Sequence, residues 1–212
     1  MSTLQSLKRR VYAVLRDSEK SFVEDQEVED LLNEAYLDLT ARLRLLRKEA
    51  TGTTTATGTI TLPTDYIEMV WLSVLPTVTS EYQEHVEWAD DRVFDSWRLP
   101  GDTPESLLAR IFNGTIETYP VAASCAYTMR YVYKPTALDS AADEPSIPEE
   151  LQVRMVNYAR GHTKYKEGEI DEGDRYLALY EQGLPSSPMS SHRERPGPIN
   201  MTPAPGWAED YS

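Results

Sequence analysis

The segment that most constrains the fold spans residues 26–48, where apolar side chains recur every three or four positions. This spacing lines one face of an α-helix, and a helix of this length would be roughly 35 Å long. Asp25 precedes it as a candidate N-cap and Gly52 follows as a candidate stop. A single apolar stripe needs other segments to cover it. Its members are Val28, Leu31, Leu32, Ala35, Tyr36, Leu39, Leu43 and Leu46.

Three further segments have helical periodicity and are natural partners for this stripe. Residues 2–16 form the first, and a polar joint at 17–25 predicts a helical hairpin with the long helix. Ser146-Ile147-Pro148-Glu149 predicts a capping box that opens a helix with its stripe between Leu151 and Tyr165. A last helix is expected from Ile170 to Leu184.

The middle of the chain instead has the signals of β-structure. Residues 51–61 are rich in Thr and Gly, 67–75 form an apolar run, and 126–134 alternate in polarity. Asn113-Gly114 between residues 107–112 and 115–119 is the strongest hairpin signal. Residues 84–97 are interpreted as a short acidic helix.

These patterns predict an α+β protein in three parts. Residues 1–50 and 146–185 would form an antiparallel helical bundle from the N- and C-terminal helix pairs. Residues 51–145 would form an acidic insertion containing a small antiparallel β-sheet, and residues 186–212 an extended, Pro-rich C-terminal arm.

The charge and composition exclude several classes of protein. A net charge of −14 argues against tight binding to a nucleic-acid backbone. Residues 50–148 carry about −9 of this charge, which suits either a solvated surface or one that must not adhere to a passing polyanion. No run approaches the length of a membrane helix, and no secretory signal is expected. Cys125 is the single cysteine, which excludes an internal disulfide.

The sequence has few candidates for chemistry, and we expect no enzyme, metal or cofactor. Phosphate-loop, nucleophile-elbow and metalloprotease motifs are absent. His162 is expected in a core, His85 stands between acidic residues as a weak metal candidate, and His192 is expected in solvent. Carboxylates at Asp65, Asp90 and Asp91 could in principle cleave a glycoside. Tyr127, Tyr131 and Tyr133 share one face of a strand, where they could stack sugars or pack a sheet.

The arm has two interpretations. Its prolines and serines are typical of a disordered terminus. Its isolated apolar residues are instead typical of a segment that becomes ordered along another protein. The candidate partner-binding residues are Ile199, Met201, Trp207 and Tyr211.

Several short motifs occur in the order found in the head-to-tail adaptor proteins of tailed bacteriophages, and the chain resembles that family over about residues 25–185. The first is Leu32-Asn33-Glu34-Ala35-Tyr36, and Leu62-Pro63-Thr64-Asp65-Tyr66 enters the inserted region. Asp102-Thr103-Pro104, the Asn113-Gly114 hairpin and Tyr131-Val132-Tyr133-Lys134-Pro135 with Leu138 are similar to the family's sheet. Ile147-Pro148-Glu149-Glu150-Leu151, Val156-Asn157-Tyr158-Ala159, and Gly168 followed by Asp174-Arg175-Tyr176-Leu177 resemble its closing helices.

The resemblance implies a structural, non-enzymatic component of the virion at the head–tail junction, made in the host cytoplasm. Such proteins form a homo-oligomeric ring, commonly of twelve copies, beneath the portal protein. The ring offers a platform to a tail or nozzle protein and continues a channel through which DNA passes without specific binding or membrane contact. The C-terminal segment often docks on the portal, but no motif assigns that role to Ile199, Met201, Trp207 or Tyr211.

Two other functions stay open at this point. One is a carbohydrate-binding or carbohydrate-cleaving domain of a virion, which would use the tyrosine-bearing strand and the nearby carboxylates. The other is a tail-side stopper or completion protein, similar in role but bound lower in the particle.

Overall fold

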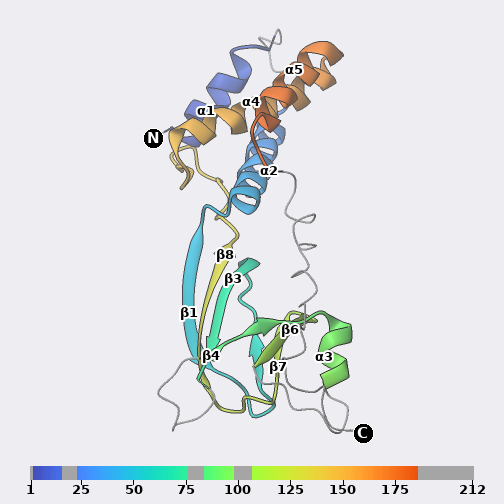
Figure 1. Cartoon of the computed structure of the whole chain (residues 1–212). Helices are drawn as coiled ribbons and strands as arrows, with labels where there is room; N and C mark the ends of the chain where they lie inside the picture. Colours follow the sequence, from blue (N-terminus) through green and yellow to red (C-terminus); the bar gives the residue numbers. More distant parts are fainter. Residues whose placement is uncertain (1, 16–22, 76–83, 98–106, 186–212) are drawn as a thin grey trace, which may run out of the picture.

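The computed structural model describes residues 2–15, 23–75, 84–97 and 107–185. Helices α1 (Leu4–Tyr12) and α2 (Asp25–Leu43) come from the N-terminal side, and α4 (Glu149–Lys166) and α5 (Ile170–Glu181) from the C-terminal side. Figure 1 shows these four helices gathered at one end of the molecule, with the strands at the other. The four helices are called the helical part below, and the strands with α3 (Asp91–Trp97) the β part.

The helical part has a hydrophobic core of its own, to which both ends of the chain contribute. Helix α4 contacts α1, α2 and α5. The close contact between α4 and α5 depends on Gly161 and Gly173, because a Cβ at Gly173 would lie 2.4 Å from the ring of Tyr165. The buried core residues include Leu4, Leu7, Val11, Val28, Leu32, Leu39, Met155, Val156, Ala159 and Tyr180.

The predicted antiparallel bundle with one inserted sheet is wrong. The described residues contain five helices and two sheets, and α5 packs chiefly on α4 rather than on two neighbours as in a four-helix bundle. The inserted region contains one of the five helices, α3, and one parallel strand pair. A stripe of apolar residues shows that a helix has a buried face but does not show which helix covers it, and this is why the packing was not predictable.

The long helix is also shorter than predicted. It ends at Leu43, and Arg44 adopts a left-handed conformation with φ of 50°. The next strand, β1 (Arg47–Thr53), takes up residues that were expected to be helical or to stop the helix, including Lys48 and Gly52. Pairing of β1 with β8 (Ala126–Tyr133) overrides the local helical pattern.

The strands form two four-stranded sheets. The first has the order β1-β8-β3-β4, with β3 at Tyr66–Val74 and β4 at Glu84–His85. The second has the order β2-β7-β6-β5, with β2 at Thr59–Thr61, β7 at Thr115–Tyr119, β6 at Leu108–Phe112 and β5 at Glu87–Trp88. The strands predicted at 67–75 and 126–134 and the hairpin at Asn113-Gly114 are confirmed, with φ of 50° and 75° at the two turn residues.

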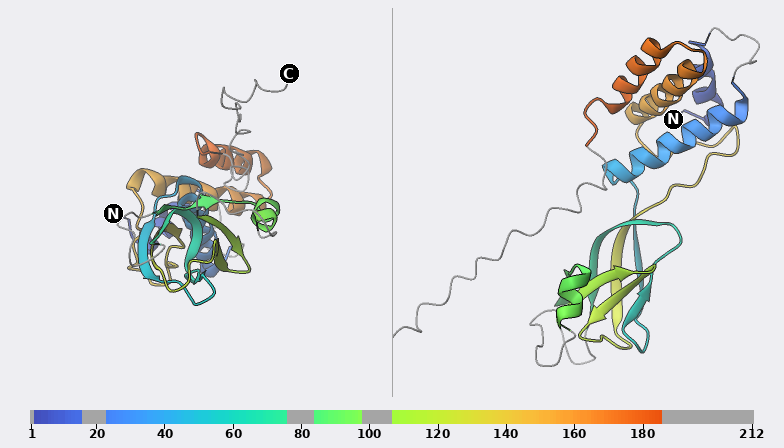
Figure 2. Two further views of the ribbon diagram at one scale, coloured as in Figure 1. Left: turned by 60° about the horizontal axis from the view of Figure 1, so that its bottom comes forward. Right: turned by 90° about the vertical axis from the view of Figure 1, so that its right-hand side faces the viewer.

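The two sheets enclose a second core. Ala50, Leu72 and Met129 from the first sheet pack against Ile60 and Ile116 from the second. Helix α3 lies on the other face of the second sheet, where the ring of Phe94 contacts that of Tyr119. The predicted helix at 84–97 is therefore wrong in its first half, which forms β4 and β5. Figure 2 shows α3 and the first sheet on opposite sides of the β part.

The helical part and the β part are joined by two chain segments, the short one at residues 44–46 and a longer one at 134–148. The predicted capping box is wrong, because Pro148 is the N-cap residue of α4 and makes no side-chain capping bond. Ser146 instead donates its backbone N–H to the hydroxyl of Tyr36 over 2.8 Å. This bond ties the second connecting segment to α2.

Candidate interaction surfaces

The arm residues predicted to bind a partner, Ile199, Met201, Trp207 and Tyr211, lie outside the described residues. The same holds for His192 and for the rest of residues 186–212. The structure does describe the end of α5 and the residues after it up to Pro185, and we call residues 180–185 the arm root.

The arm root is fastened to the helical part by polar contacts at the end of α5. Tyr180 donates its hydroxyl to Asp38 on α2, and Arg42 bonds Glu181 over 2.7 Å. Arg154 on α4 donates to the backbone oxygen of Tyr180 over 2.9 Å. Burial, together with the bond to Asp38, raises the pKa of Tyr180. The arm therefore starts from a fixed point on α2 and α4.

The tyrosine-bearing strand packs a core rather than presenting a stacking platform. Tyr131 is 1% exposed and donates its hydroxyl to Asp65 over 3.0 Å. Lys48 lies 3.2 Å from the same carboxylate. Burial opposes the ionisation of Asp65, but the bonds from Tyr131 and Lys48 outweigh it and lower the pKa of the carboxyl below its usual value. Tyr127 lies against Gly52, where a Cβ would meet its hydroxyl at 2.7 Å.

The other carboxylates that were considered for glycoside cleavage organise α3. Asp90 accepts the backbone N–H of Val93 over 2.8 Å and so caps the helix. Arg110 on β6 lies 3.5 Å from Asp91, 2.9 Å from Asp95 and 2.8 Å from Glu117. Arg110 is itself buried and thus binds α3 to the second sheet.

The described histidine, His162, lies between two aromatic rings. Its ring centroid is 4.5 Å from that of Tyr158 and 6.2 Å from that of Tyr165. The backbone of His85 belongs to β4, but its side chain is not among those that the structure describes. The described part of the chain has no group of three or more His, Cys, Asp or Glu residues that could hold a metal ion.

The junction between the two parts is held by an ion pair and by a backbone clamp. Arg44, just after α2, donates from Nε to Glu68 on β3 over 2.9 Å, with a second bond from Nη2, and Glu68 is buried. Asn33 on α2 binds both backbone groups of Leu138, over 2.8 Å and 3.2 Å. Two hollows of about 260 and 300 Å³ flank this junction, and both are lined by Tyr36, Pro135, Thr136 and Ala137.

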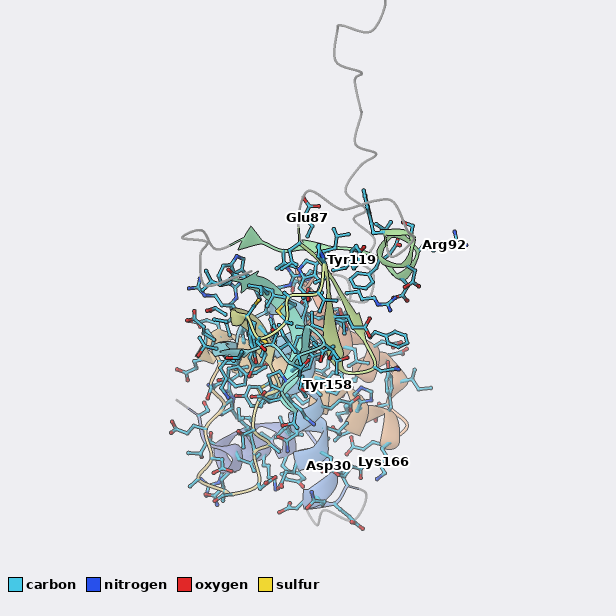
Figure 3. The ribbon with its side chains drawn as sticks, turned by 90° about the horizontal axis from the view of Figure 1, so that it is seen from below. Asp30, Glu87, Arg92, Tyr119, Tyr158 and Lys166 are labelled. Carbon is cyan, nitrogen blue, oxygen red and sulfur yellow. The ribbon has the colours of Figure 1, made fainter. Side chains whose placement is uncertain are left out.

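Three large apolar side chains on α3 and the neighbouring strands are exposed. Trp88 on β5, Val93 on α3 and Phe112 on β6 are 43%, 44% and 43% exposed. They do not form one patch, because the parallel register pairs Trp88 with Ala109, which is buried between the two sheets, whereas Phe112 lies beside Arg110 on the face that carries α3. Figure 3 shows Glu87 and Tyr119 near each other, with Arg92 projecting outward from α3. Single exposed apolar side chains of this kind are ordinary on a protein surface.

Sequence reasoning identified Trp88 and Val93 as apolar but placed them on one helix. Their position on separate elements depends on the parallel pairing of β5 with β6, which is not a local signal. Arg110 was missed, although a charged residue between Ala109 and Ile111 in a strand pattern is a detectable signal of a two-faced sheet.

A comparison with protein families identifies a match over most of the chain. The family model described as SU10 adaptor protein matches residues 2–202. A search of curated proteins returns no match. Among the described residues, no helix is long and apolar enough to cross a bilayer.

Proposed function

Since the chain belongs to the SU10 adaptor protein family, we propose that it forms a ring beneath the portal protein of a phage, joins head to tail and continues the DNA channel. The family assignment covers the chain almost from end to end and confirms the phage adaptor resemblance of the sequence. It makes the protein a structural component of a virion, and a non-enzymatic role follows from that assignment.

The separation into two parts supports this proposal, because an adaptor must contact a different protein at each end. The helical part and the β part each have a hydrophobic core, and Figure 1 shows them at opposite ends of the molecule. In our proposal the helical part lies towards the portal and the β part towards the tail or nozzle protein. The acidic balance of the β part would let DNA slide past without adhering.

We propose that the arm binds the portal protein through Ile199, Met201, Trp207 and Tyr211. The observation that supports this role is the fixed arm root, where Tyr180 and Glu181 are bound to α2. A segment that starts from a rigid point and carries aromatic anchors can bind with a smaller loss of conformational entropy.

Deletion of residues 186–212 tests the docking role. We expect the shortened protein to keep its helical circular dichroism and thermal transition, because both described cores lie before residue 186. It should no longer co-purify with the portal protein, whereas the full chain should. A fourfold variant that replaces Ile199, Met201, Trp207 and Tyr211 by Ser is the matched control for length. Retention of portal binding by the shortened protein would show that the arm is not the docking element.

A further inference from the structure

The first sheet has one long strand at its edge, β1. Its seven residues pair with β8 in an unbroken antiparallel register, from Arg47 opposite Val132 to Thr53 opposite Ala126. The other strands at the edges of the two sheets, β2, β4 and β5, have three residues or two. Of the edge strands in the described residues, β1 therefore presents the longest regular edge to another chain.

The backbone bonds at both ends of β1 show which of its groups face the free side. Tyr133 donates its N–H to the oxygen of Leu46, and Thr54 donates its N–H to the oxygen of Cys125. Both pairs share the register of the ladder, so the even-numbered residues of β1 turn their backbone groups towards β8 and the odd-numbered ones turn them away. The outward groups belong to Arg47, Glu49, Thr51 and Thr53.

This edge has little protection against another strand. No residue in the ranges that the structure describes binds the outward backbone groups, and all four of their side chains are exposed. Native proteins protect a long edge with prolines, bulges or charges. Strand β1 has no proline and no shift in register, and its charges stop at Glu49. By contrast, β3 carries two register shifts along the length that β4 leaves free.

The arm contains a segment that fits this edge. Pro cannot donate to a ladder, and the arm has two proline-free stretches of the length of β1, residues 189–195 and 206–212. The second holds Trp207 and Tyr211, which are proposed above to bind the portal protein. The first is Met189-Ser190-Ser191-His192-Arg193-Glu194-Arg195. An extended segment that joins a free sheet edge is held by main-chain hydrogen bonds, whatever its side chains.

The positions of the arm root and of β1 indicate a second copy as the acceptor. Glu181 in the arm root bonds Arg42 near the end of α2, and β1 starts at Arg47, so the arm leaves the molecule close to the level at which β1 begins. Figure 1 shows α5, from which the arm starts, on the right of the helical part and β1 on the left of the β part. An arm on one side and a free edge on the other suit a head-to-tail exchange between neighbours.

We propose that residues 189–195 of one copy add a strand to the β1 edge of a second copy. The inference rests on the proposed ring and specifies how neighbouring subunits are linked in it. Because the arm and the edge are different surfaces, the exchange repeats from copy to copy and closes when the rotation between copies divides a full turn. The arm residues proposed to bind the portal protein begin at Ile199 and lie outside the added strand.

Cysteine pairs in the full chain test the added strand. With the two segments aligned over their whole length, Thr51 lies beside residue 191 in an antiparallel pairing and beside residue 193 in a parallel one. Two double variants therefore carry Thr51→Cys with either Ser191→Cys or Arg193→Cys, while the buried Cys125 stays in place. Under mild oxidation of the assembled protein, one of the two should form covalently linked chains of several copies on a non-reducing gel.

The control for the cross-links replaces Thr51→Cys by Arg92→Cys, at an exposed residue of α3, and should form no such chains. If the wild type assembles only on purified portal protein, the same oxidation is carried out on that complex.

A proline on the edge tests the hydrogen bonds themselves. Thr51→Pro removes an N–H that faces away from β8, so the pairing of β1 with β8 and the melting temperature should change little. Trypsin cleavage after Arg193 in the assembled protein should be faster in Thr51→Pro than in wild type, because a paired strand resists proteolysis. Thr51→Ala keeps the N–H and, as the matched control, should be cleaved at the wild-type rate.

Other results would overturn the inference. Assembly of the wild type without linked chains in either double variant, or equal cleavage of the wild type and Thr51→Pro, would remove the β1 edge from the subunit contact and leave the ring itself standing. Cross-links confined to single copies would show that each arm lies on its own β1 and would refute the exchange. A wild type that forms no ring with or without portal protein would overturn the proposed function, and this inference with it.

Discussion

At the scale of single residues, two glycines allow α4 and α5 to approach each other closely. Gly161 and Gly173 face each other across this contact, and a Cβ at Gly161 would lie 2.7 Å from the side chain of Leu177. Glycine in a helix interior costs about 1 kcal/mol relative to alanine. Glycine is nevertheless favoured at both positions, because the side chains of Tyr165 and Leu177 occupy the space that a Cβ would need.

Replacement of Gly173 by Ala tests which effect is larger. Better helix propensity favours the variant by about 1 kcal/mol, whereas overpacking costs about 1–3 kcal/mol. The contact of 2.4 Å with the ring of Tyr165 is short enough that we expect a net loss in the free energy of unfolding. Urea denaturation measures it, with Arg175→Ala on the exposed side of α5 as the control. A stabilised Gly173→Ala protein would show that the two helices can separate without loss.

The carboxyl of Asp65 gives the fold a component of stability that depends on pH. Its pKa lies below the ordinary value of 3.8 in the folded protein, since the bonds from Tyr131 and Lys48 outweigh the effect of burial. This contribution is therefore complete above that value and is lost as the pH falls through the lower, folded pKa. We expect the melting temperature of Asp65→Asn to fall less steeply than that of wild type below about pH 4. If the melting temperatures of the two proteins fall by the same amount between pH 6 and pH 2, this role for Asp65 is contradicted.

At the scale of elements, sequence patterns predicted most segments but misplaced their ends and partners. The strand at 67–75 and the hairpin at Asn113-Gly114 were predictable because alternation and turn chemistry are local signals. The end of α2 was not predictable, because Leu46 continues the helical spacing of apolar residues while strand pairing already starts at Arg47. The capping box at Ser146 failed for a similar reason, since the hydroxyl of Tyr36, distant in sequence, binds the Ser146 N–H.

The link between α2 and β3 can be tested through Arg44. Its guanidinium is the partner of the buried carboxylate of Glu68, so Arg44→Ala leaves that carboxylate without it. We expect a loss of about 1–3 kcal/mol in the free energy of unfolding, moderated because Arg44 is itself half exposed. Arg44→Gly accommodates the positive φ without strain and therefore isolates the loss of the ion pair. The neighbouring exposed residue Arg47, changed to Ala, serves as a control, and an equal effect there would contradict the assigned role of Arg44.

At the scale of the whole molecule, the chain combines two hydrophobic cores with an arm root that is bound to α2 and α4. The adaptor resemblance was predictable from the order of short motifs, and the family match confirms it. The placement of Trp88 and Val93 on separate elements was not predictable, because it depends on the parallel pairing of β5 with β6. The proposed portal-docking residues of the arm stay a prediction.

The proposed function depends most on assembly into a ring that continues the portal channel. Electron microscopy of the purified full chain mixed with the portal protein tests this directly. We predict end views with a central opening, and side views in which a second tier sits on one end of the portal. Portal particles without an added tier, accompanied by small separate particles of the chain, would contradict it.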